Sequence, residues 1–303
     1  MTLFDLFERY RDIIPEFSSF QESLRRPLPV HLRLNPLKAD PAVILQALGQ
    51  KGVALRRMSR RNETLFTAPG LEGPGNLMEY TLGFLHPQAL TSCLAAIALD
   101  VKPGSYVLDM CASPGGKTSH MAALAENTGL IIANELYPSR HIPLAHTLAR
   151  LGVLNCVVTA YQAQEFPMRE RFDYVLADVP CSGEGRIRIP GEGPGRAKGK
   201  SSRDFSQLQK RIILRGYDLL GKGGVMLYAT CTYDPEENES VVDHLLRNRD
   251  ACLLPIDTGF PQEPGIRDWN TAHYDRQLTK AVRFYPHRVD SVGFFMARIG
   301  RRG

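Results

Sequence analysis

Apolar and polar residues follow two different spacings along the chain, which predict helices in some segments and strands in others. Over residues 1–28, apolar side chains recur every three or four positions, as on one face of a helix. Residues 31–35 alternate like a strand, and a second helical pattern covers about 41–50. The stretch 69–75, rich in glycine and proline, is typical of a boundary loop. We therefore expect a small α/β domain over residues 1–75.

From about residue 87 onward, short apolar runs alternate with segments of helix length. Five of these runs are predicted strands: 106–109, 129–133, 156–159, 174–178 and 225–230. The alternation is typical of a doubly wound parallel sheet. Two later runs, 282–285 and 293–298, are close together in the sequence, which predicts an antiparallel hairpin. Five parallel strands followed by such a hairpin are the usual plan of methyltransferases. We therefore expect a seven-stranded, Rossmann-like sheet in a domain over residues 76–303.

The composition limits the possible classes of protein. The 303 residues are 43% hydrophobic and 23% charged, which suits one or two domains with a buried core and excludes a disordered or collagen-like chain. No apolar run approaches the roughly 20 residues of a membrane span. The first residues lack the basic region and cleavage site of a signal peptide, so we expect a cytoplasmic protein. The formal charge of +5 permits a polyanionic partner without requiring one.

The six cysteines stand singly in the sequence. They are Cys93, Cys111, Cys156, Cys181, Cys231 and Cys252. In a reducing compartment an even number does not imply disulfides, and without a Cys-x-x-Cys pair there is no zinc signature. We therefore expect no metal. Most of these cysteines should be ordinary core residues, and any special one should be a reactive thiol.

Ligands of an open parallel sheet bind at the carboxyl ends of its strands, so the residues that follow each strand are the candidates for a site. The first strand is followed by Asp109-Met-Cys-Ala-Ser-Pro-Gly-Gly-Lys-Thr118. Its glycines allow a ligand to approach the backbone, and the next helix offers free amides to a carboxylate or phosphate. A phosphate-binding loop would need glycine where Cys111 stands. A glycine-rich turn without a ligand is the alternative.

Glu135 follows the second strand, twenty residues after Gly115. An acidic side chain at this spacing is placed to bind the hydroxyl groups of a ribose. A glutamate at a strand end can also be merely solvated. Together with the glycine-rich loop, Glu135 favours a cofactor that contains adenosine.

Two cysteines follow the fourth and fifth strands. Cys181 lies in Asp178-Val-Pro-Cys-Ser-Gly-Glu-Gly185, and Cys231 lies in Ala229-Thr-Cys-Thr-Tyr-Asp-Pro-Glu-Glu-Asn-Glu239. The usual role of a cysteine is a buried structural one. Because both stand at carboxyl ends of neighbouring strands, we expect their thiols to converge on the same crevice.

Three of these stretches together resemble the Nop/Sun family of RNA cytosine-5 methyltransferases. They are Asp-x-Cys-Ala-x-Pro-Gly-Gly-Lys at 109–117, Asp-x-Pro-Cys-Ser-Gly-x-Gly at 178–185 and Thr-Cys-Thr-x-x-Pro-Glu-Glu-Asn-Glu at 230–239. The resemblance extends from residues 32–38 to 284–297. It implies a methyltransferase sheet preceded by an RNA-recognition-like domain over residues 1–75.

The resemblance also implies a mechanism. Carbon-5 of cytosine is a poor nucleophile until a thiolate adds to carbon-6 and turns the ring into an enamine. By resemblance Cys231 is that nucleophile and Cys181 assists release of the covalent adduct. Asp178 matches the residue that bonds the cytosine edge, and Lys117 is expected to steady the thiolate or the base. A free thiol has a pKa of about 8.5, so Cys231 needs an electropositive setting or a nearby base.

The implied cofactor is S-adenosylmethionine, with S-adenosylhomocysteine as product. The residues implied to bind it are Cys111, Ala112, Ser113, Pro114, Gly115, Gly116, Lys117, Glu135, Arg140, Gln162, Asp178 and Pro180. The sequence departs from the family at one of these positions. The family commonly has an aspartate for the adenine amino group after the third strand, and here Gln162 is the best match. A glutamine can still accept that hydrogen bond.

The partner that the resemblance implies is RNA, either ribosomal or transfer RNA. The sequence itself does not decide the oligomeric state, for which a monomer is the default expectation, and it predicts no membrane and no metal. The candidate RNA contacts are Arg33, Asn35, Lys38, Arg186, Arg188, Arg203, His287 and Arg288. The basic, glycine-rich stretch 186–203 suits a loop that grips phosphates, because phosphate contacts supply much of the affinity for nucleic acid. A solvated insertion is the other interpretation of this stretch.

Three other functions remain to be weighed. A non-catalytic RNA-binding or ribosome-assembly factor with this fold has no need of thiols at two strand ends. A methyltransferase for an amino group typically has Asn-Pro-Pro-Tyr after the fourth strand, where this chain has Asp178-Val-Pro-Cys. A nucleoside triphosphatase is disfavoured by Cys111. RNA cytosine-5 methylation is therefore the leading hypothesis.

Overall fold

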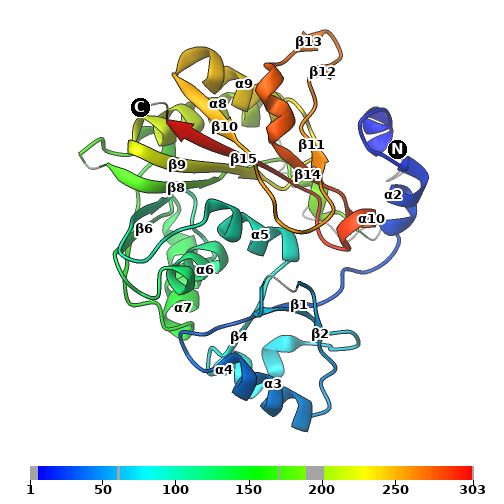
Figure 1. Cartoon of the computed structure of the whole chain (residues 1–303), viewed down its shortest axis with the longest axis vertical. Coiled ribbons are helices and arrows are strands. Elements are labelled where there is room, and N and C mark those ends of the chain that lie inside the picture. Colours follow the sequence, from blue (N-terminus) through cyan, green and yellow to red (C-terminus); the bar gives the residue numbers. More distant parts are fainter. Residues whose placement is uncertain (1–5, 60–61, 170, 189–200, 302–303) are drawn as a thin grey trace. The chain divides into compact units, whose positions relative to one another are not determined.

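The computed structural model divides into two compact units (Figure 1). The residues that the structure describes are 6–59, 62–169, 171–188 and 201–301. One unit, here called the discontinuous unit, consists of Met1–Leu28 and Gln164–Gly303. The other, here called the continuous unit, consists of Pro29–Ala163. No helix in the described ranges is long and apolar enough to cross a membrane.

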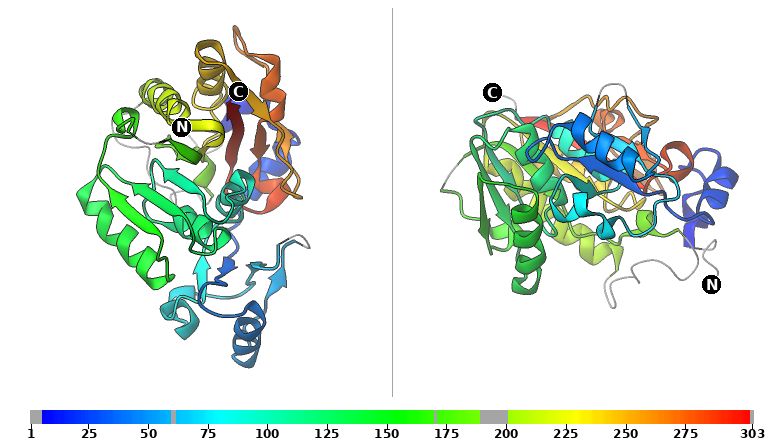
Figure 2. Two further views of the ribbon diagram at one scale, coloured as in Figure 1. Left: turned by 60° about the vertical axis from the view of Figure 1, so that its left-hand side comes forward. Right: turned by 90° about the horizontal axis from the view of Figure 1, so that it is seen from below.

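The continuous unit begins with a small antiparallel sheet in the order β2-β3-β1-β4. Its strands are β1 (His31–Leu34), β2 (Arg56–Arg57), β3 (Leu65–Thr67) and β4 (Leu85–Pro87). Helix α3 (Pro41–Gln50) begins with its proline in the first turn and the Asp40 side chain bonded to the amide of Ala42. Ile44 and Leu48 of this helix pack against Leu32 of the sheet, with α3 along one face (Figure 2). The predicted strand and helix of this segment are confirmed.

The rest of the continuous unit consists of parallel strands joined by helices. After α4 (Met78–Thr81) and α5 (Leu90–Leu99), the strands lie in the order β5-β6-β7. These elements are β5 (Tyr106–Asp109), α6 (Gly116–Leu124), β6 (Leu130–Asn134), α7 (Pro138–Arg150) and β7 (Cys156–Thr159). Both pairings are parallel, and Asp109 lies opposite Ala133. The first three predicted strands are confirmed.

The discontinuous unit contains the remaining predicted strands, in the order β11-β14-β15-β9-β8. Its main elements are β8 (Phe172–Asp178), α8 (Ser202–Asp218), β9 (Leu220–Thr230), α9 (Glu239–Asn248), β14 (Val282–Phe284), α10 (Pro286–Val289) and β15 (Phe294–Arg301). Strands β8 and β9 are parallel, whereas β15 runs antiparallel to both β9 and β14. The predicted hairpin is therefore confirmed.

Four short strands of this unit were not expected from the sequence. They are β10 (Ala251–Leu254), β11 (Glu263–Pro264), β12 (Asp268–Trp269) and β13 (Ala272–His273). Strand β10 pairs with β15 and β11 pairs with β14, whereas β12 and β13 pair with each other. Strands β11, β12 and β13 have two residues each, which is too few positions to show an apolar alternation, so pattern reasoning misses them.

The described part of the N-terminal segment (residues 6–28) contains a 3-10 turn at Glu8–Tyr10 and the helix α2 (Phe17–Ser23). Its apolar side chains Phe7 and Phe20 pack edge-on against Tyr233 of the same unit. The boundaries between the two units thus lie after residues 28 and 163. The four-stranded sheet extends to Pro87. The boundary at residue 75, between a predicted RNA-recognition-like domain and a predicted methyltransferase domain, stays a prediction.

Asn35 provides a test of how the small sheet is anchored within its unit. The Asn35 side chain is buried and donates to the carbonyl oxygens of Gly83, at 2.9 Å, and Leu151, at 2.8 Å. Replacing Asn35 with Ala leaves two carbonyls without these donors, so we expect a loss of about 2 kcal/mol in the free energy of unfolding. Urea denaturation measures this loss.

Lys38→Ala is the matched control, because Lys38 lies on the same loop but is exposed. Its free energy of unfolding should stay within about 0.5 kcal/mol of the wild type. Equal stability of Asn35→Ala and Lys38→Ala would show that the Asn35 bonds do not anchor the sheet.

Candidate functional site

The glycine-rich loop between β5 and α6 is fixed at both of its ends. The Thr118 hydroxyl donates to the carboxylate of Asp109 at 2.7 Å, which ties the first turn of α6 to the end of β5. The amide of Ala112 donates to the carbonyl of Asn134 at 2.9 Å. Gly115 has φ +98°, and a Cβ there would lie 3.1 Å from the Leu144 side chain. The left-handed backbone and the crowded Cβ position therefore both favour glycine at this position, directly before α6.

Three residues that the sequence predicted to bind the cofactor contact one another: Glu135, Arg140 and Ser113 of the loop. Glu135 is buried, accepts from the amide of Tyr137 at 3.0 Å and pairs with Arg140 at 3.2 Å. The guanidinium of Arg140 also donates to the carbonyl of Ser113 at 2.8 Å, and the Ser113 hydroxyl donates to the carbonyl of Arg140 at 3.1 Å. Arg140 thus connects the predicted ribose-binding acid with the predicted loop for the methionine end.

Asn134 is a residue of this region that sequence reasoning missed. Its side-chain NH₂ donates to the carbonyls of Met110 and Tyr161, at 3.1 and 2.8 Å. Its side-chain oxygen accepts from the Thr159 hydroxyl and from the Tyr161 amide, at 3.0 and 2.9 Å. One buried amide therefore fixes the ends of β5, β6 and β7 and the backbone that leads to the exposed Gln162. Its signal in the sequence was an amide at the last position of an apolar strand.

In the discontinuous unit, the structure brings together the two cysteines that the sequence singled out. Parallel pairing places Asp178, the last residue of β8, opposite Ala229 of β9. Cys181 and Cys231 follow these strands, and their Sγ atoms lie 3.3 Å apart. The contact with Cys231, together with burial, raises the pKa of Cys181 well above that of a free thiol. Cys181 therefore keeps its proton and is suited to donate it to the sulfur of Cys231.

Hydrogen bonds between the two cysteine loops keep these thiols together. The Ser182 hydroxyl donates to that of Thr232 at 2.8 Å, and the amide of Gly185 donates to the carbonyl of Cys231 at 2.9 Å. A Cβ at Gly185 would lie 2.3 Å from the carbonyl oxygen of Gly293, so this close approach requires glycine. Sequence reasoning assigned no role to these residues.

A buried carboxylate connects the N-terminal segment with both cysteine loops. Glu184 accepts from the hydroxyl of Tyr10 at 2.6 Å and pairs with Arg9 at 3.0 Å. The hydroxyl of Thr232, next to Cys231, lies 3.5 Å from the same carboxylate. Arg9 also pairs with Asp234 at 3.1 Å. Residues separated by more than 170 positions meet here, so no local pattern could have indicated the contact.

Glu237 is the second buried carboxylate of this region. One of its oxygens accepts from the amide of Ser182 at 3.0 Å and from the side chain of Gln209 at 2.9 Å. Burial raises the pKa of Glu237 to about 7, although these hydrogen bonds oppose the rise. Glu237 therefore gains or loses its proton near neutral pH. Its carboxylate is bonded to the amide of Ser182, the residue that follows Cys181.

The remaining predicted catalytic and cofactor residues lie at the expected positions of their elements. Lys117 is in the first turn of α6, half-buried, and Asp178 ends β8. Cys111 is half-buried in the glycine-rich loop, and Pro180 is exposed before Cys181. Their contacts with a cofactor or a base stay predictions.

The predicted RNA contacts differ in their exposure. Arg33 is buried and donates to Gln88 and Ser119, at 3.0 and 2.9 Å. Arg188 is buried and donates to the carbonyls of Ser23 and Ser291, at 3.0 and 2.6 Å. These two guanidinium groups, like the amide of Asn35, are engaged inside the chain.

The other predicted RNA contacts are closer to the surface. Exposed basic side chains stand at Lys38, Arg186, Arg203 and Arg288. His287 is half-buried and stacks on Tyr285. Most of the basic stretch 186–203 lies outside the described residues, so its predicted role as an RNA clamp stays a prediction.

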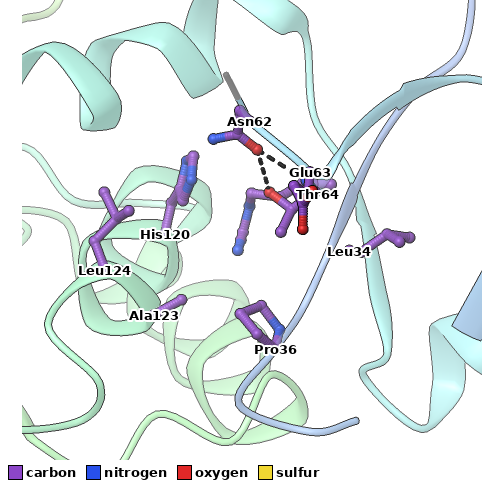
Figure 3. Close-up of a pocket in the computed structure, with 9 residues that line it drawn as sticks. Leu34, Pro36, Asn62, Glu63, Thr64, His120, Ala123 and Leu124 are labelled. Atoms are coloured by element: carbon purple, nitrogen blue, oxygen red, sulfur yellow. Dashed lines mark hydrogen bonds between the residues drawn. The ribbon is translucent and has the colours of Figure 1, made fainter. Parts of the chain in front are cut away.

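A separate pocket of about 200 Å³ lies in the continuous unit (Figure 3). Asn62 and Thr64 line one side, and His120, Ala123 and Leu124 of α6 line the other. Of the predicted site residues only Arg33 belongs to its lining, so the pocket is not part of the strand-end site. In the ranges that the structure describes, no cluster of three or more histidine, cysteine or acidic side chains is suited to hold a metal ion.

Glu237 gives the stability of the protein a specific pH dependence. Between about pH 4.5 and pH 7 the folded protein holds a proton that the unfolded chain has released, so raising the pH through this window favours unfolding. Glu237→Gln resembles the protonated acid and does not titrate. The variant should therefore gain stability relative to the wild type as the pH rises through this window, with no further change above it.

Urea denaturation of both proteins at about pH 5 and about pH 8 measures this difference. Other groups that titrate in this range are common to the two proteins and cancel in the comparison. Parallel pH dependences would contradict the assignment of a raised pKa to Glu237.

Comparisons with known proteins agree with this geometry. Residues 96–300 match the family described as 16S rRNA methyltransferase RsmB/F. The tRNA (cytosine(49)-C(5))-methyltransferase of Pyrococcus abyssi is 37% identical over 299 residues, which cover 97% of this chain and 94% of the relative. The human 28S rRNA (cytosine(4447)-C(5))-methyltransferase is 36% identical over 97% of this chain, but the match covers 37% of the human protein. The chain spans less than two thirds of the length of several such relatives.

A solved structure shares the fold over nearly the whole chain. The crystal structure of a methyltransferase homolog protein from Pyrococcus horikoshii has a TM-score of 0.84 and 31% identity, and covers 97% of this chain and 94% of its own. The α/β class of the methyltransferases, predicted from the strand pattern, is thereby confirmed, as is the resemblance carried by the three motifs at 109–117, 178–185 and 230–239. The chain therefore belongs to the RsmB/F family of methyltransferases, within the Nop/Sun group that those motifs indicated.

Proposed function

We propose that this protein transfers a methyl group from S-adenosylmethionine to carbon-5 of a cytosine in RNA and releases S-adenosylhomocysteine. The observation that carries the proposal is the pair of thiols, Cys181 and Cys231, held 3.3 Å apart at the ends of β8 and β9. A non-catalytic RNA-binding factor would not need this pair. The relatives named above act on tRNA in one case and on rRNA in another, so the proposal includes both classes of RNA.

The residues of the continuous unit fit the proposed cofactor. Gly115 stands directly before α6, whose first turn offers backbone amides without intrahelical partners to a carboxylate. Glu135 is buried, and its carboxylate is already oriented by Arg140 and the amide of Tyr137. In the proposal the loop 111–117 holds the methionine end, Glu135 the ribose and Gln162 the adenine. When bound, S-adenosylmethionine supplies an electrophilic methyl group.

The proposed chemistry begins at Cys231. Its thiolate adds to carbon-6 of the cytosine, and Asp178 bonds the edge of the base as charge develops on the ring. Carbon-5 can then accept the methyl group. Once a base has removed the proton from carbon-5, the bond between carbon-6 and the sulfur of Cys231 breaks. The thiol of Cys181 keeps its proton, and by donating it towards the sulfur of Cys231 it stabilises the departing thiolate.

In the proposal the exposed basic residues bind RNA phosphates, whereas the buried ones support the fold. Four exposed side chains are accessible for such contacts: Lys38, Arg186, Arg203 and Arg288. His287 directly precedes Arg288 in the sequence. Arg33, Asn35 and Arg188 act through their bonds inside the chain. The cytoplasmic location and the monomeric state stay predictions.

Incubation with radiolabelled S-adenosylmethionine and total RNA from a strain that lacks the gene tests the reaction. We expect the label in 5-methylcytidine, and the size of the labelled RNA separates ribosomal from transfer RNA. Cys231→Ala should abolish labelling because the nucleophile is lost, while binding of the cofactor stays nearly unchanged. Cys252→Ala is the matched control and should keep normal labelling, since its sulfur contacts the carbonyl of Gly300 on β15. Normal turnover by Cys231→Ala would refute the assignment of the nucleophile.

Cys181→Ala should instead trap the adduct between protein and RNA. Without the Cys181 thiol, Cys231 leaves carbon-6 slowly, so the covalent complex accumulates during turnover. Denaturing gel electrophoresis with labelled RNA shows such a complex as a slowly migrating band. The band should be missing in the double variant Cys181→Ala/Cys231→Ala, and its absence in Cys181→Ala alone would argue against a role of Cys181 in release.

A further inference from the structure

We propose that the two thiols form an oxidative modification site: a hydroperoxide converts Cys181 and Cys231 into a reversible disulfide. The proposal concerns the sulfur chemistry of the folded protein and does not depend on the identity of the RNA. Its consequence for activity, the loss of a free nucleophile, rests on the proposed function.

The first argument is the distance between the sulfurs. The Sγ atoms of Cys181 and Cys231 are already in contact at 3.3 Å. A disulfide holds its sulfurs about 2.05 Å apart, so the two atoms have to approach by little more than ~1 Å. The parallel pairing of β8 and β9 brings together the strand ends from which both loops start. With the sulfurs already 3.3 Å apart, the disulfide needs no large movement of either loop.

The second argument is that both loops are held in this arrangement by bonds that oxidation leaves intact. The bond from the amide of Gly185 to the carbonyl of Cys231 uses the backbone. The bond between the hydroxyls of Ser182 and Thr232 uses neighbouring side chains. The effective concentration of one thiol at the other is therefore high, which favours the intramolecular reaction over further oxidation by a second peroxide.

The third argument separates this pair from other cysteines of the chain. Cys93 is almost fully buried, which keeps a peroxide in solvent away from it, and its thiol donates towards the carbonyl of Gln88. Cys252 donates towards the carbonyl of Gly300 on the neighbouring strand. Cys181 and Cys231 combine partial exposure with a sulfur partner.

The reaction has two steps that balance. The thiolate of Cys231 attacks one oxygen of hydrogen peroxide, which breaks the O–O bond and gives a sulfenic acid and hydroxide. The sulfur of Cys181 then attacks the sulfur of that sulfenic acid. The S–O bond breaks, and the hydroxyl group leaves as water with the proton of Cys181. Two thiol sulfurs are oxidised and one peroxide is reduced. A dithiol reductant reverses the change.

The site is tested by mass spectrometry on the reduced full chain without RNA. We expect that brief treatment with hydrogen peroxide lowers the mass by two hydrogen atoms and yields, after alkylation and digestion, one peptide pair that joins Cys181 to Cys231. Dithiothreitol should separate the pair. Cys252→Ser should form the same link, since that cysteine lies outside the pair.

Cys181→Ser provides the complementary measurement. In this variant Cys231 has no resolving thiol, so peroxide should carry it on to the sulfinic acid, which dithiothreitol does not reverse. A wild-type protein in which Cys231 becomes a sulfinic acid without a link, or in which the link joins other cysteines, would overturn the proposal. So would a protein whose two thiols stay unchanged.

Activity is a separate readout. Oxidised wild-type protein should lose RNA methylation and regain it with dithiothreitol. The link itself is measured without RNA or cofactor, so a link that forms in a protein without methyltransferase activity would refute the proposed function alone. An active protein that forms no link would refute the modification site alone.

Discussion

The parallel pairing of β8 and β9 is the constraint on which the chemistry of the discontinuous unit depends. The paired stretches Val175–Ala177 and Met226–Tyr228 are apolar and buried, and backbone hydrogen bonds along β8 set the register of the two strands. A shift by one residue would turn the side chains of a strand to the opposite face and separate the two thiols. Beyond the strand ends, hydrogen bonds of three polar residues hold the two cysteine loops against each other: Ser182, Thr232 and Glu237.

Two buried carboxylates show how the loops are kept in place. Glu237 joins the Cys181 loop to α8 through Gln209, and Glu184 joins it to the N-terminal segment through Tyr10. Buried acids are costly unless they are paired or bonded, so each must keep its partners for the loops to hold their arrangement. The two acids differ in the charge of their partners. Glu184 is paired with the cation of Arg9, whereas the described partners of Glu237 are neutral. That difference agrees with the raised pKa of Glu237.

The major strands and the strand-end residues could be predicted because both depend on local sequence. An apolar run such as Val175–Ala177 shows a buried strand directly, and the rule that ligands bind at carboxyl ends then points to Cys181 and Cys231. The groups that surround a charged side chain in the fold cannot be inferred from its neighbours in the sequence. Nothing near Arg188 indicates that its guanidinium is buried against carbonyls of Ser23 and Ser291. The same holds for Tyr10 and Glu184, whose contact depends on the finished fold.

The packing of the N-terminal segment also has a consequence for synthesis of the chain on the ribosome. Phe7 and Phe20 are made more than 200 residues before Tyr233 and Tyr285, which belong to the same aromatic cluster. The bond from Tyr285 to the carbonyl of Ile13 joins residues 272 positions apart. Until then the apolar face of the segment has no native partner, although domains generally fold in order from the N-terminus. The apolar face of this segment therefore has to wait for more than 200 further residues of synthesis before its native partners can bury it.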